Sequence, residues 1–382
     1  MIFRNLEEQP KQSTTDSNAA DRRFMELALA LGRRGWGRTW PNPAVGAVVV
    51  NNGVIVGRGW TQPGGRPHAE PVALAQAGEA ARGATLYVTL EPCSHVGKSP
   101  PCADAVIAAG ITRVVSAIED PNPEVGGQGH ARLRAAGIAV DIGLGAAEAA
   151  CDHAGHFRRI RDKRPHVILK LAVSADDKIA ATGHKPVAIS GEVARTRMHL
   201  LRAQCDAILV GIGTVLSDDP LLTCRLPGME ARSPVRIVLD RSLRIPATSR
   251  LVHSARSTPL WVVTSNLAEA PAAARLGSAG AQVIRLASTS KAGLDLAEML
   301  RAVADRGITR LLVEGGSRVA SSFVAANLVD EFWLLRGADT IGADGVAALD
   351  ASPLGTITGS PAFRVHGSES LGSDTLTVYE RL

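Results

Sequence analysis

The sequence predicts an α/β protein built from two domains. Its 382 residues are more than one hydrophobic core usually serves, because single cores stop growing at roughly 250–300 residues. Strand-like and helix-like segments alternate in both halves, a pattern typical of mostly parallel sheets covered by helices. Between the halves, residues 150–165 are polar, carry several basic side chains and end at Pro165, so we expect the domain boundary there. One more surface helix inside a larger domain is the alternative interpretation of this stretch.

The first domain is expected over residues 21–150, after a polar segment, residues 1–20, that we expect to be a flexible extension. Apolar side chains at helical spacing predict its first helix, and short β-branched runs predict its strands. Its helices are expected at 22–33, from 69, from 102 and at 128–136. Its strands are expected at 45–50, 54–58, 84–89, 112–118 and 138–142, with a hairpin turn at Asn51-Asn52-Gly53 between the first two. Together these elements form a small α/β layer sandwich.

The second domain is expected over residues 165–382. A strongly apolar strand at 166–174 begins it. Further strands are expected at 207–211, 235–239, 260–264, 283–286, 310–314, 331–336 and 376–380. Helices are expected at 191–203, at 293–305 and from 317. This alternation predicts a mostly parallel sheet with both faces covered.

The composition argues against several classes of protein. No run approaches 18 continuous apolar residues, and the N-terminus lacks the basic-then-apolar order of a signal peptide, so we expect neither a membrane span nor export. Five cysteines, an odd number, favour a reducing cytoplasm, and Cys151, Cys205 and Cys224 are expected to be buried thiols. The net charge of +5 suits a phosphorylated small molecule or nucleic acid. Because aromatic residues make up only 3% and follow no basic stripe, a single-strand nucleic-acid surface is not expected.

One group of residues in the first domain points to zinc chemistry. His68 precedes an apolar helix, Cys93 follows a strand, and Cys102 begins the next helix. One imidazole and two thiolates leave the fourth zinc position open for water, which is the catalytic arrangement. Glu70, two residues after His68, is suited to carry protons during hydrolytic deamination. This His-x-Glu, followed by Pro-Cys and a second Cys, is the signature of zinc nucleobase deaminases.

The spacing of the two cysteines departs from the commonest form of that signature. Eight residues, 94–101, separate Cys93 from Cys102, where two are usual. On spacing alone, the pair could be unrelated thiols, or His95 could replace one of the ligands.

Several motifs in this half resemble the deaminase part of the bifunctional riboflavin-biosynthesis deaminase-reductase family. They are Pro41-Asn42-Pro43 with Val45-Gly46, His68-Ala69-Glu70, Glu91-Pro92-Cys93-Ser94-His95-x-Gly97-Lys98-x-Pro100-Pro101-Cys102 and Asp120-Pro121-Asn122-Pro123. The resemblance implies a cytidine-deaminase-like α/β/α sandwich. It also implies that Asn42 holds the pyrimidine or ribose, that Lys98 contacts the substrate, and that Asp120 and Asn122 line the pocket. Thr61 stands where many relatives have a His near the substrate, so we expect a lost or reshaped contact there.

The second half carries a weaker signal of its own. Val313 to Ser317 is a strand running into a glycine pair and then a helix, where backbone N–H groups can hold a phosphate. A tight strand-to-helix turn explains the pattern equally well.

The rest of this half resembles the reductase domain of the same family, whose fold is like that of dihydrofolate reductase. The matching motifs are Lys170-Leu171-Ala172 with Ser174 and Asp176, Leu201-Arg202-Ala203 with Asp206-Ala207-Ile208, Gly211 with Thr214, Asp218-Asp219-Pro220 with Leu222-Thr223-x-Arg225, and Val313-Glu314-Gly315-Gly316. The resemblance implies that NADPH contacts Ala172, Thr214 and the 316–322 turn with Gly316, Ser317 and Arg318. It implies that Arg202 and Arg225 hold the substrate phosphate, and that Asp218, Leu222 and Glu314 line the substrate site.

Two positions depart from the reductase pattern. The family usually reads Ser-Leu-Asp-Gly where this chain has Ser174-Ala175-Asp176-Asp177, and it usually has Trp-Ile where this chain has Ala188-Ile189. We expect that the missing glycine alters a turn and that the missing Trp removes a flat surface near the cofactor.

The resemblance implies two consecutive steps of flavin synthesis. The first is zinc-dependent deamination of 2,5-diamino-6-ribosylamino-4(3H)-pyrimidinone 5′-phosphate, and the second is NADPH-dependent reduction of ribosyl to ribityl. The alternatives are a deaminase with a weakened reductase domain, a nucleic-acid-editing deaminase and a non-catalytic scaffold. We expect phosphorylated pyrimidine substrates, no nucleic-acid or membrane partner, a cytoplasmic location and a homo-oligomer.

Overall fold

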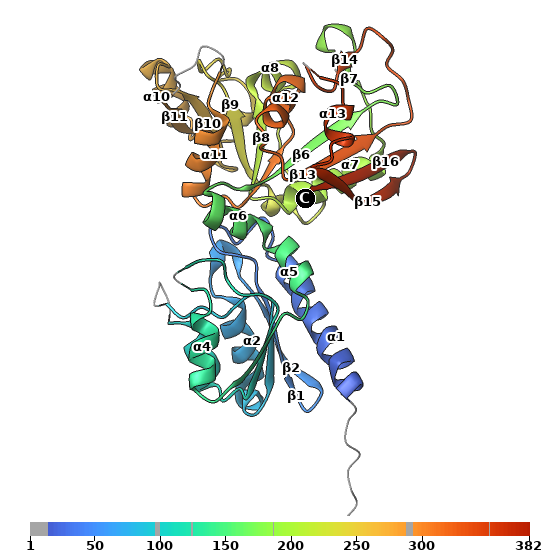
Figure 1. Ribbon diagram of the computed structural model, residues 1–382. Coiled ribbons are helices and arrows are strands. Elements are labelled where there is room, and N and C mark those ends of the chain that lie inside the picture. Colours follow the sequence, from blue (N-terminus) through green and yellow to red (C-terminus); the bar gives the residue numbers. More distant parts are fainter. Residues whose placement is uncertain (1–13, 96–99, 124, 186, 288–292, 351) are drawn as a thin grey trace, which may run out of the picture. The chain divides into compact units, whose positions relative to one another are not determined.

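The computed structural model describes residues 14–95, 100–123, 125–185, 187–287, 293–350 and 352–382. The chain divides into two compact units (Figure 1). The first comprises Met1–Gly35 and Ala44–His153, and the second comprises Trp36–Pro43 and Ala154–Leu382. The segment Trp36–Pro43 thus groups with the second unit, whereas the sequence predicts a first domain that is continuous from residue 21.

The first unit contains a five-stranded sheet in the order β2-β1-β3-β4-β5. Its strands are β1 (Gly46–Asn51), β2 (Val54–Trp60), β3 (Thr85–Val88), β4 (Arg113–Ser116) and β5 (Ala139–Ile142). β1 is antiparallel to β2 and β3, while β3, β4 and β5 are parallel to one another. Asn52 and Gly53 both have positive φ at the β1–β2 turn, as the predicted hairpin requires.

Helices cover both faces of this sheet. They are α1 (Thr14–Arg33), α2 (Ala69–Ala77), α3 (Cys102–Ala108), α4 (Gln128–Ala135) and α5 (Ala146–Asp152). On one face, Met25 and Ala28 of α1 pack with Val48, Tyr87 and Val115 of the strands. On the other face, β2 carries glycines where α2 approaches most closely. Because α1 begins at Thr14, residues 14–20 are helical and do not belong to an extension.

The second unit contains a nine-stranded sheet in the order β11-β10-β9-β8-β12-β6-β13-β16-β15. Its strands are β6 (His166–Val173), β8 (Ala207–Gly211), β9 (Val235–Leu239), β10 (Leu260–Ser265), β11 (Gln282–Leu286), β12 (Arg310–Val313), β13 (Glu331–Arg336), β15 (Phe363–Leu371) and β16 (Asp374–Arg381). Neighbouring strands are parallel from β11 to β13, and β16 and β15 add antiparallel pairs at one edge. The predicted mostly parallel sheet is therefore confirmed.

Alternate side chains of β6 enter two different cores, one on each face of the sheet. Val167, Leu169 and Leu171 pack in the core that contains Phe323. Ile168 packs in the core that contains Leu201. The helices are α6 (Ala154–Asp162), α7 (Glu192–Ala203), α8 (Ile212–Asp218), α9 (Arg250–His253), α10 (Ala270–Ser278), α11 (Leu296–Asp305), α12 (Ser317–Ala325) and α13 (Gly355–Thr358), with a small hairpin of β7 (Lys178–Ala180) and β14 (Val346–Ala347).

Some elements of the second unit escape the sequence patterns. β15 is an edge strand with mostly exposed side chains, so it lacks the apolar alternation of a half-buried strand. The two units divide between His153 and Ala154, inside the boundary predicted at residues 150–165. The end of α5 and all of α6 lie in this stretch, so it is largely helical, as the alternative interpretation expects. Cys151 is exposed rather than buried, while Cys205 and Cys224 are buried as predicted. Among the described residues, we find no helix whose length and hydropathy would let it cross a bilayer.

Candidate active sites

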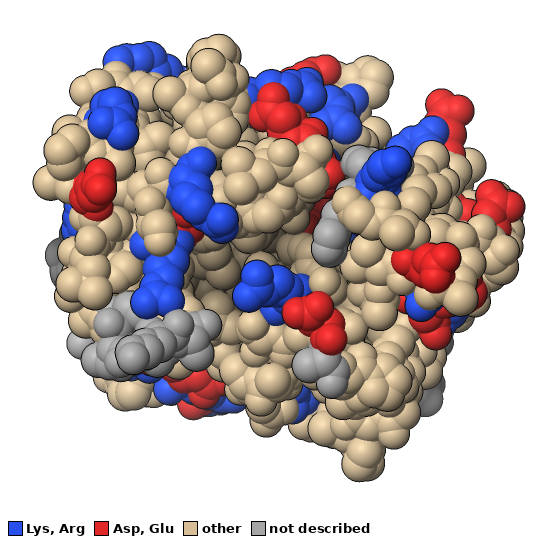
Figure 2. Space-filling model, turned by 90° about the horizontal axis from the view of Figure 1, so that it is seen from above, with Lys and Arg blue, Asp and Glu red and all other residues tan. Residues whose placement is uncertain are grey.

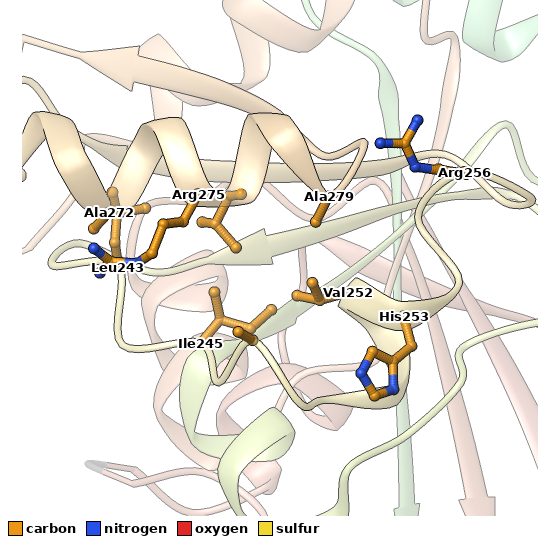
Figure 3. A pocket seen from close by; sticks show the side chains of 10 residues that line it. Leu243, Ile245, Val252, His253, Arg256, Ala272, Arg275 and Ala279 are labelled. Atoms are coloured by element: carbon orange, nitrogen blue, oxygen red, sulfur yellow. The ribbon is translucent and has the colours of Figure 1, made fainter.

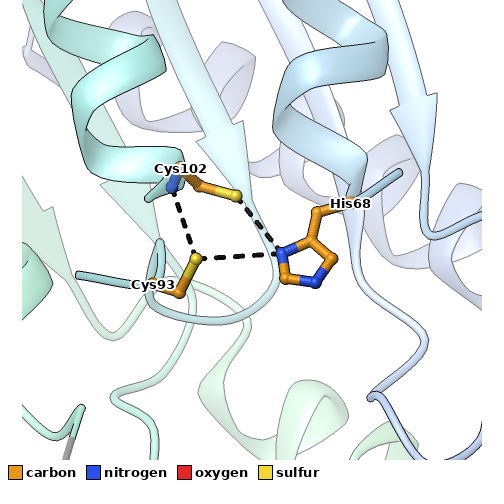
Figure 4. A group of neighbouring side chains, drawn as sticks. All are labelled: His68, Cys93 and Cys102. Atoms are coloured by element: carbon orange, nitrogen blue, oxygen red, sulfur yellow. Dashed lines mark hydrogen bonds between the residues drawn. The ribbon is translucent and has the colours of Figure 1, made fainter. Parts of the chain in front are cut away.

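Three side chains from separate segments of the first unit meet at one point (Figure 4). His68 Nδ1 lies 3.3 Å from Cys102 Sγ and 3.8 Å from Cys93 Sγ. The backbone N–H of Cys102 donates to Cys93 Sγ over 3.3 Å. The three potential ligand atoms all lie within 4.8 Å of one another, and His95 is exposed and outside this group. The donor set of one imidazole and two thiols fits a catalytic zinc ion.

Local structure explains why these residues converge. His68 is the N-cap of α2, and Cys102 is the first residue of α3. Gly59 on β2 lets α2 lie close to the sheet, because a Cβ there would be 2.2 Å from the carbonyl oxygen of Ala69. Although eight residues separate Cys93 and Cys102 in the sequence, their thiols lie close enough to ligate one metal ion.

The three groups of the cluster share protons, and their pKa values shift in different directions. A hydrogen bond from the Cys102 side chain lowers the pKa of the Cys93 thiol to about 4, and His68 contributes in the same direction. The bond to Cys93 and burial raise the pKa of Cys102. The hydrogen bond to Cys93 also raises the pKa of His68. A divalent cation would replace these shared protons, because metal binding releases protons from its ligands.

Glu70 lies in the first turn of α2 and is only 3% exposed. Burial raises the pKa of its carboxyl group to about 7. Among the described residues, its Oε2 has no hydrogen-bond partner. A buried carboxyl with a pKa near neutrality can both accept and donate a proton, which is what acid–base catalysis requires.

The other predicted residues of the deaminase site lie in different places. Asp120 is buried, and its Oδ1 accepts the backbone N–H of Asn122 over 2.8 Å. Asn42 belongs to the Trp36–Pro43 segment, where its N–H donates to the Thr39 carbonyl. Lys98 lies outside the described residues.

Thr61 is not available to a substrate. It is 1% exposed, and its hydroxyl accepts the backbone N–H of Val45 over 3.0 Å. Thr61, the residue that follows β2, is thus tied to the residue that precedes β1.

A second cluster lies in the second unit, where β12 ends. Glu314 follows β12 and accepts hydrogen bonds from Arg202 Nε at 2.8 Å and Arg202 Nη2 at 2.9 Å. Lys170 Nζ of β6 lies 3.8 Å from the same carboxylate. Burial by itself raises the pKa of Glu314. The positive charges of Arg202 and Lys170 have a larger effect in the opposite direction, so the pKa falls to about 2. Burial lowers the pKa of Lys170.

More cationic groups border this cluster. The N–H of Arg225 donates to His199 Nδ1 over 3.4 Å. Burial lowers the pKa of His199, and the charges of Arg202 and Arg225 act in the same direction. Leu222 is buried, and Asp218, the last residue of α8, is exposed. The structure thus brings Arg202, Arg225 and Glu314 into one neighbourhood.

Sequence analysis assigned no role to Lys170 or His199. The signal for Lys170 was present, since it is the one charged side chain in the apolar strand from Val167 to Val173. His199 carried no comparable signal, because it lies on a helix with many polar neighbours.

The predicted cofactor residues lie around the start of α12. Gly316 is the N-cap of α12 and has no side-chain cap. A Cβ on Gly316 would lie 3.7 Å from Thr214 Oγ1, so the two positions are adjacent. Ser317 is buried and Arg318 is exposed in the first turn, and Ala172 is half-buried on β6. Uncapped N–H groups at a helix start can bind phosphate, so these residues fit a dinucleotide.

The two departures from the family pattern have different outcomes. Asp177 adopts φ +62, a conformation that favours glycine, and its N–H donates to the Ser174 carbonyl over 3.1 Å. A turn therefore forms here with Asp in a conformation that favours glycine. Ala188 is exposed between Lys185 and α7.

The second unit also contains a cavity of about 440 Å³ beneath α10 (Figure 3). Apolar side chains such as Ile245, Val252 and Leu276 line it together with His253, Arg256 and Arg275. None of the predicted site residues belongs to this lining.

Figure 2 shows one face of the molecule with a central hollow, where basic and acidic side chains are interspersed and form no continuous basic stripe.

Two family models match the chain, one in each half. Cytidine and deoxycytidylate deaminase zinc-binding region matches residues 18–118, and RibD C-terminal domain matches residues 165–377. Riboflavin biosynthesis protein RibD of Aquifex aeolicus is 40% identical over 361 residues, which cover 94% of this chain and 98% of the relative. The protein of the same name from Escherichia coli is 38% identical over 365 residues, covering 93% and 97%.

Solved structures agree with these matches. RibD of Acinetobacter baumannii superimposes with a TM-score of 0.85 at 33% identity, covering 96% of this chain and 99% of that chain. A diaminohydroxyphosphoribosylaminopyrimidine deaminase/5-amino-6-(5-phosphoribosylamino)uracil reductase of Thermotoga maritima gives a TM-score of 0.83 at 36% identity, covering 96% and 100%.

Proposed function

The chain belongs to the RibD family and is a bifunctional deaminase and reductase of riboflavin biosynthesis, and from this premise we propose which residues perform each step. The deaminase domain corresponds to the first unit, near the predicted range 21–150, and the reductase domain to the second unit, near the predicted range 165–382. The deaminase acts on 2,5-diamino-6-ribosylamino-4(3H)-pyrimidinone 5′-phosphate, and the reductase reduces the ribosyl group of its product with NADPH. The observation that carries the proposal is the meeting of His68, Cys93 and Cys102 beside the buried Glu70.

In the deaminase site, His68, Cys93 and Cys102 hold zinc. Bound zinc supplies a water whose pKa is near neutrality. Glu70 would take one proton from the attacking water and pass it to the ring nitrogen. It would then take the second proton from the new hydroxyl group and pass it to the amine, which leaves as ammonia. Burial raises the pKa of this carboxyl group, which favours proton transfer in both directions, because an acid–base group works best when its pKa is near the working pH. Asn42, Lys98, Asp120 and Asn122 hold the substrate.

In the reductase site, the residues around Glu314 orient substrate and cofactor. Arg225 and Arg202 bind the substrate phosphate, and Asp218, Leu222 and Glu314 line the site. The α12 N-terminus with Gly316, Ser317 and Arg318 binds NADPH together with Ala172 and Thr214. NADPH supplies the hydride, while these residues set the distance and orientation of the two reactants. We further propose that the protein is a cytoplasmic homo-oligomer. Its partners are small phosphorylated pyrimidines, with no nucleic-acid or membrane partner.

Separate assays of the two steps test the proposal. Zinc-loaded protein is given the diamino-pyrimidinone phosphate, and ammonia release and NADPH oxidation are followed independently. Glu70→Gln should keep zinc and NADPH oxidation of the deaminated substrate but lose ammonia release, because the amide cannot carry the proton. Glu79→Gln, an exposed residue just beyond α2, is the matched control and should behave as wild type. Ammonia release at the wild-type rate by Glu70→Gln would exclude the role proposed for Glu70.

A further inference from the structure

Glu91 is a buried carboxylate at the end of β3 whose two oxygens bind one loop. Its side chain is 0% exposed. Oε2 accepts the backbone N–H groups of Asp120 at 3.2 Å and Gly127 at 2.9 Å. Oε1 accepts those of Gly129 at 2.8 Å and His130 at 3.2 Å. One carboxylate therefore holds both ends of the loop between β4 and α4, and it caps the first turn of α4 from a distant segment.

The bond to Asp120 determines where the proposed substrate residues lie. The Asp120 carboxylate accepts the N–H of Asn122 at 2.8 Å, and the Asn122 carbonyl accepts the N–H groups of Val125 at 2.8 Å and Gly126 at 2.7 Å. These hydrogen bonds link Asp120 to Asn122 and Asn122 to Val125 and Gly126, while Glu91 binds the N–H groups of Asp120 and Gly127 on either side. Removing this anchor would free Asp120 and Asn122 to move together.

The same segment continues directly into the metal cluster. Pro92 and Cys93 follow Glu91, and the Cys93 carbonyl accepts the N–H of Ala103 in α3 at 3.1 Å. A Cβ on Gly129 would lie 2.0 Å from the carbonyl oxygen of Pro92, so the first turn of α4 lies against this segment. Glu91 thus joins the loop with Asp120 to the segment with Cys93.

A second metal site is the competing interpretation. Glu91, Glu119 and His130 have potential ligand atoms within 4.8 Å of one another. The four N–H groups, however, already occupy the Glu91 oxygens, and the N-terminus of α4 has a positive partial charge that repels a cation. Burial lowers the pKa of His130, which favours the form of imidazole that ligates metals, so it is the occupied Glu91 oxygens and the helix charge that disfavour a metal here. The arrangement is that of a helix cap.

We propose that Glu91 is a positioning residue of the deaminase, which holds Asp120 and Asn122 at a set distance from the cluster of His68, Cys93 and Cys102 without contacting substrate or metal. The proposal rests on the substrate-binding role proposed above for Asp120. It adds a residue that acts through the loop rather than on the reacting atoms.

The test uses Glu91→Gln, which keeps the side-chain size but places an NH2 group against backbone N–H donors. We expect KM for ammonia release to rise by about 10- to 100-fold, the range found when residues supporting an active site are changed, with a smaller change in kcat. Zinc should remain at the wild-type content, and NADPH oxidation of the deaminated substrate should be unchanged, which shows that the protein is folded. Glu91→Asp keeps the charge and should recover part of the loss. Glu119→Gln, in the same loop but exposed, is the matched control and should match wild type in both reactions.

The double variant separates positioning from general stability. If Glu91 acts through Asp120, then Glu91→Gln should raise KM little further, by less than about twofold, in an Asp120→Asn background. Three results would overturn the proposal. The two substitutions could raise KM independently, so that their fold-changes multiply in the double variant. Glu91→Gln could lose zinc, or its KM could equal that of the wild type. A wild-type KM in Asp120→Asn alone would instead contradict the role of Asp120, and with it the route by which Glu91 acts. A reduced metal content in Glu119→Gln would support the second metal site and overturn the cap.

Discussion

The guanidinium group of Arg202 and the carboxylate of Glu314 form a two-point pair, with N–O distances of 2.8 and 2.9 Å, between α7 and the end of β12. Side-chain exposure is 16% for Arg202 and 9% for Glu314, so the pair is largely shielded from water. Lys170 lies 3.8 Å from the same carboxylate, which means that one anion balances two cations. Arg202 and Glu314, both proposed to contact the reductase substrate, therefore constrain one another.

Glu314→Gln should destabilise the reductase unit strongly. It leaves Arg202 and Lys170 without their anion, and breaking a buried pair in this way costs about 3–5 kcal/mol. Urea unfolding followed by circular dichroism measures the loss. Asp162→Asn removes a more exposed pair with Arg158 and should cost less than about 1 kcal/mol. Equal losses in the two variants would contradict the shielding described here.

The same carboxylate should make stability depend on acid. The pKa of Glu314 is about 2 in the folded protein and 4.5 without these contacts. Since the folded pKa is the lower one, its contribution is complete above 4.5 and is lost as the pH falls towards about 2. The difference in unfolding free energy between wild type and Glu314→Gln should shrink across this window. A difference that stays constant there would rule out ionised Glu314 as its source.

Asp177 should tolerate glycine but not valine. Its φ of +62 is accessible to Asp and is unstrained for Gly, so glycine would relieve backbone strain in the folded state. Glycine also makes the unfolded chain more flexible, which lowers the free energy of unfolding and offsets this gain. Its ion pair with Arg336 is half-exposed and contributes little. We expect Asp177→Gly to change the unfolding free energy by less than about 1 kcal/mol, whereas Asp177→Val should cost about 1–3 kcal/mol because a β-branched residue is strained there. Thermal unfolding of both variants measures these changes. An Asp177→Val variant as stable as the wild type would contradict the left-handed conformation of residue 177.

Gly59→Ala should impair the deaminase selectively. The added methyl group would meet the backbone of Ala69 and Ala73 at 2.2 and 2.6 Å and push the first turn of α2 from the sheet. His68 and Glu70 would move with it, and a displacement near 1 Å can cost about 100-fold in rate. Ammonia release should fall by at least about tenfold while NADPH oxidation persists. Gly277→Ala, where a Cβ meets open space, is the control and should affect neither reaction.

Metal removal should separate the two activities. A strong zinc chelator should abolish ammonia release, added zinc should restore it, and NADPH oxidation should continue throughout, because the metal cluster belongs to the first unit alone. Cys102→Ser should bind less zinc because it loses one of the two thiolate ligands. Cys151→Ser, at an exposed cysteine outside the cluster, should retain it. Simultaneous loss of both activities on chelation would contradict a metal confined to the deaminase.

Much of the fold was readable from local patterns. Apolar runs predicted β8 and β9 with their observed bounds, and Asn52 and Gly53 form the predicted hairpin turn. The metal cluster was readable too, because each ligand lies at the start of a helix or just after a strand, where its direction is set locally. β15 could not be predicted, since an exposed edge strand has no periodic apolar face.

The contacts between distant segments were decided by tertiary structure. The sequence alone predicted most of the strands and several helices, and it predicted His68, Cys93 and Cys102 as a donor set suited to zinc, since these depend on neighbours within a few residues. It did not determine that Glu91 holds the ends of the 120–127 loop, that Lys170 and Arg202 share Glu314, or that Trp36–Pro43 belongs to the second unit. Those contacts depend on strand order and on how closely buried backbones approach, and hydrophobic periodicity along one segment carries no information about either.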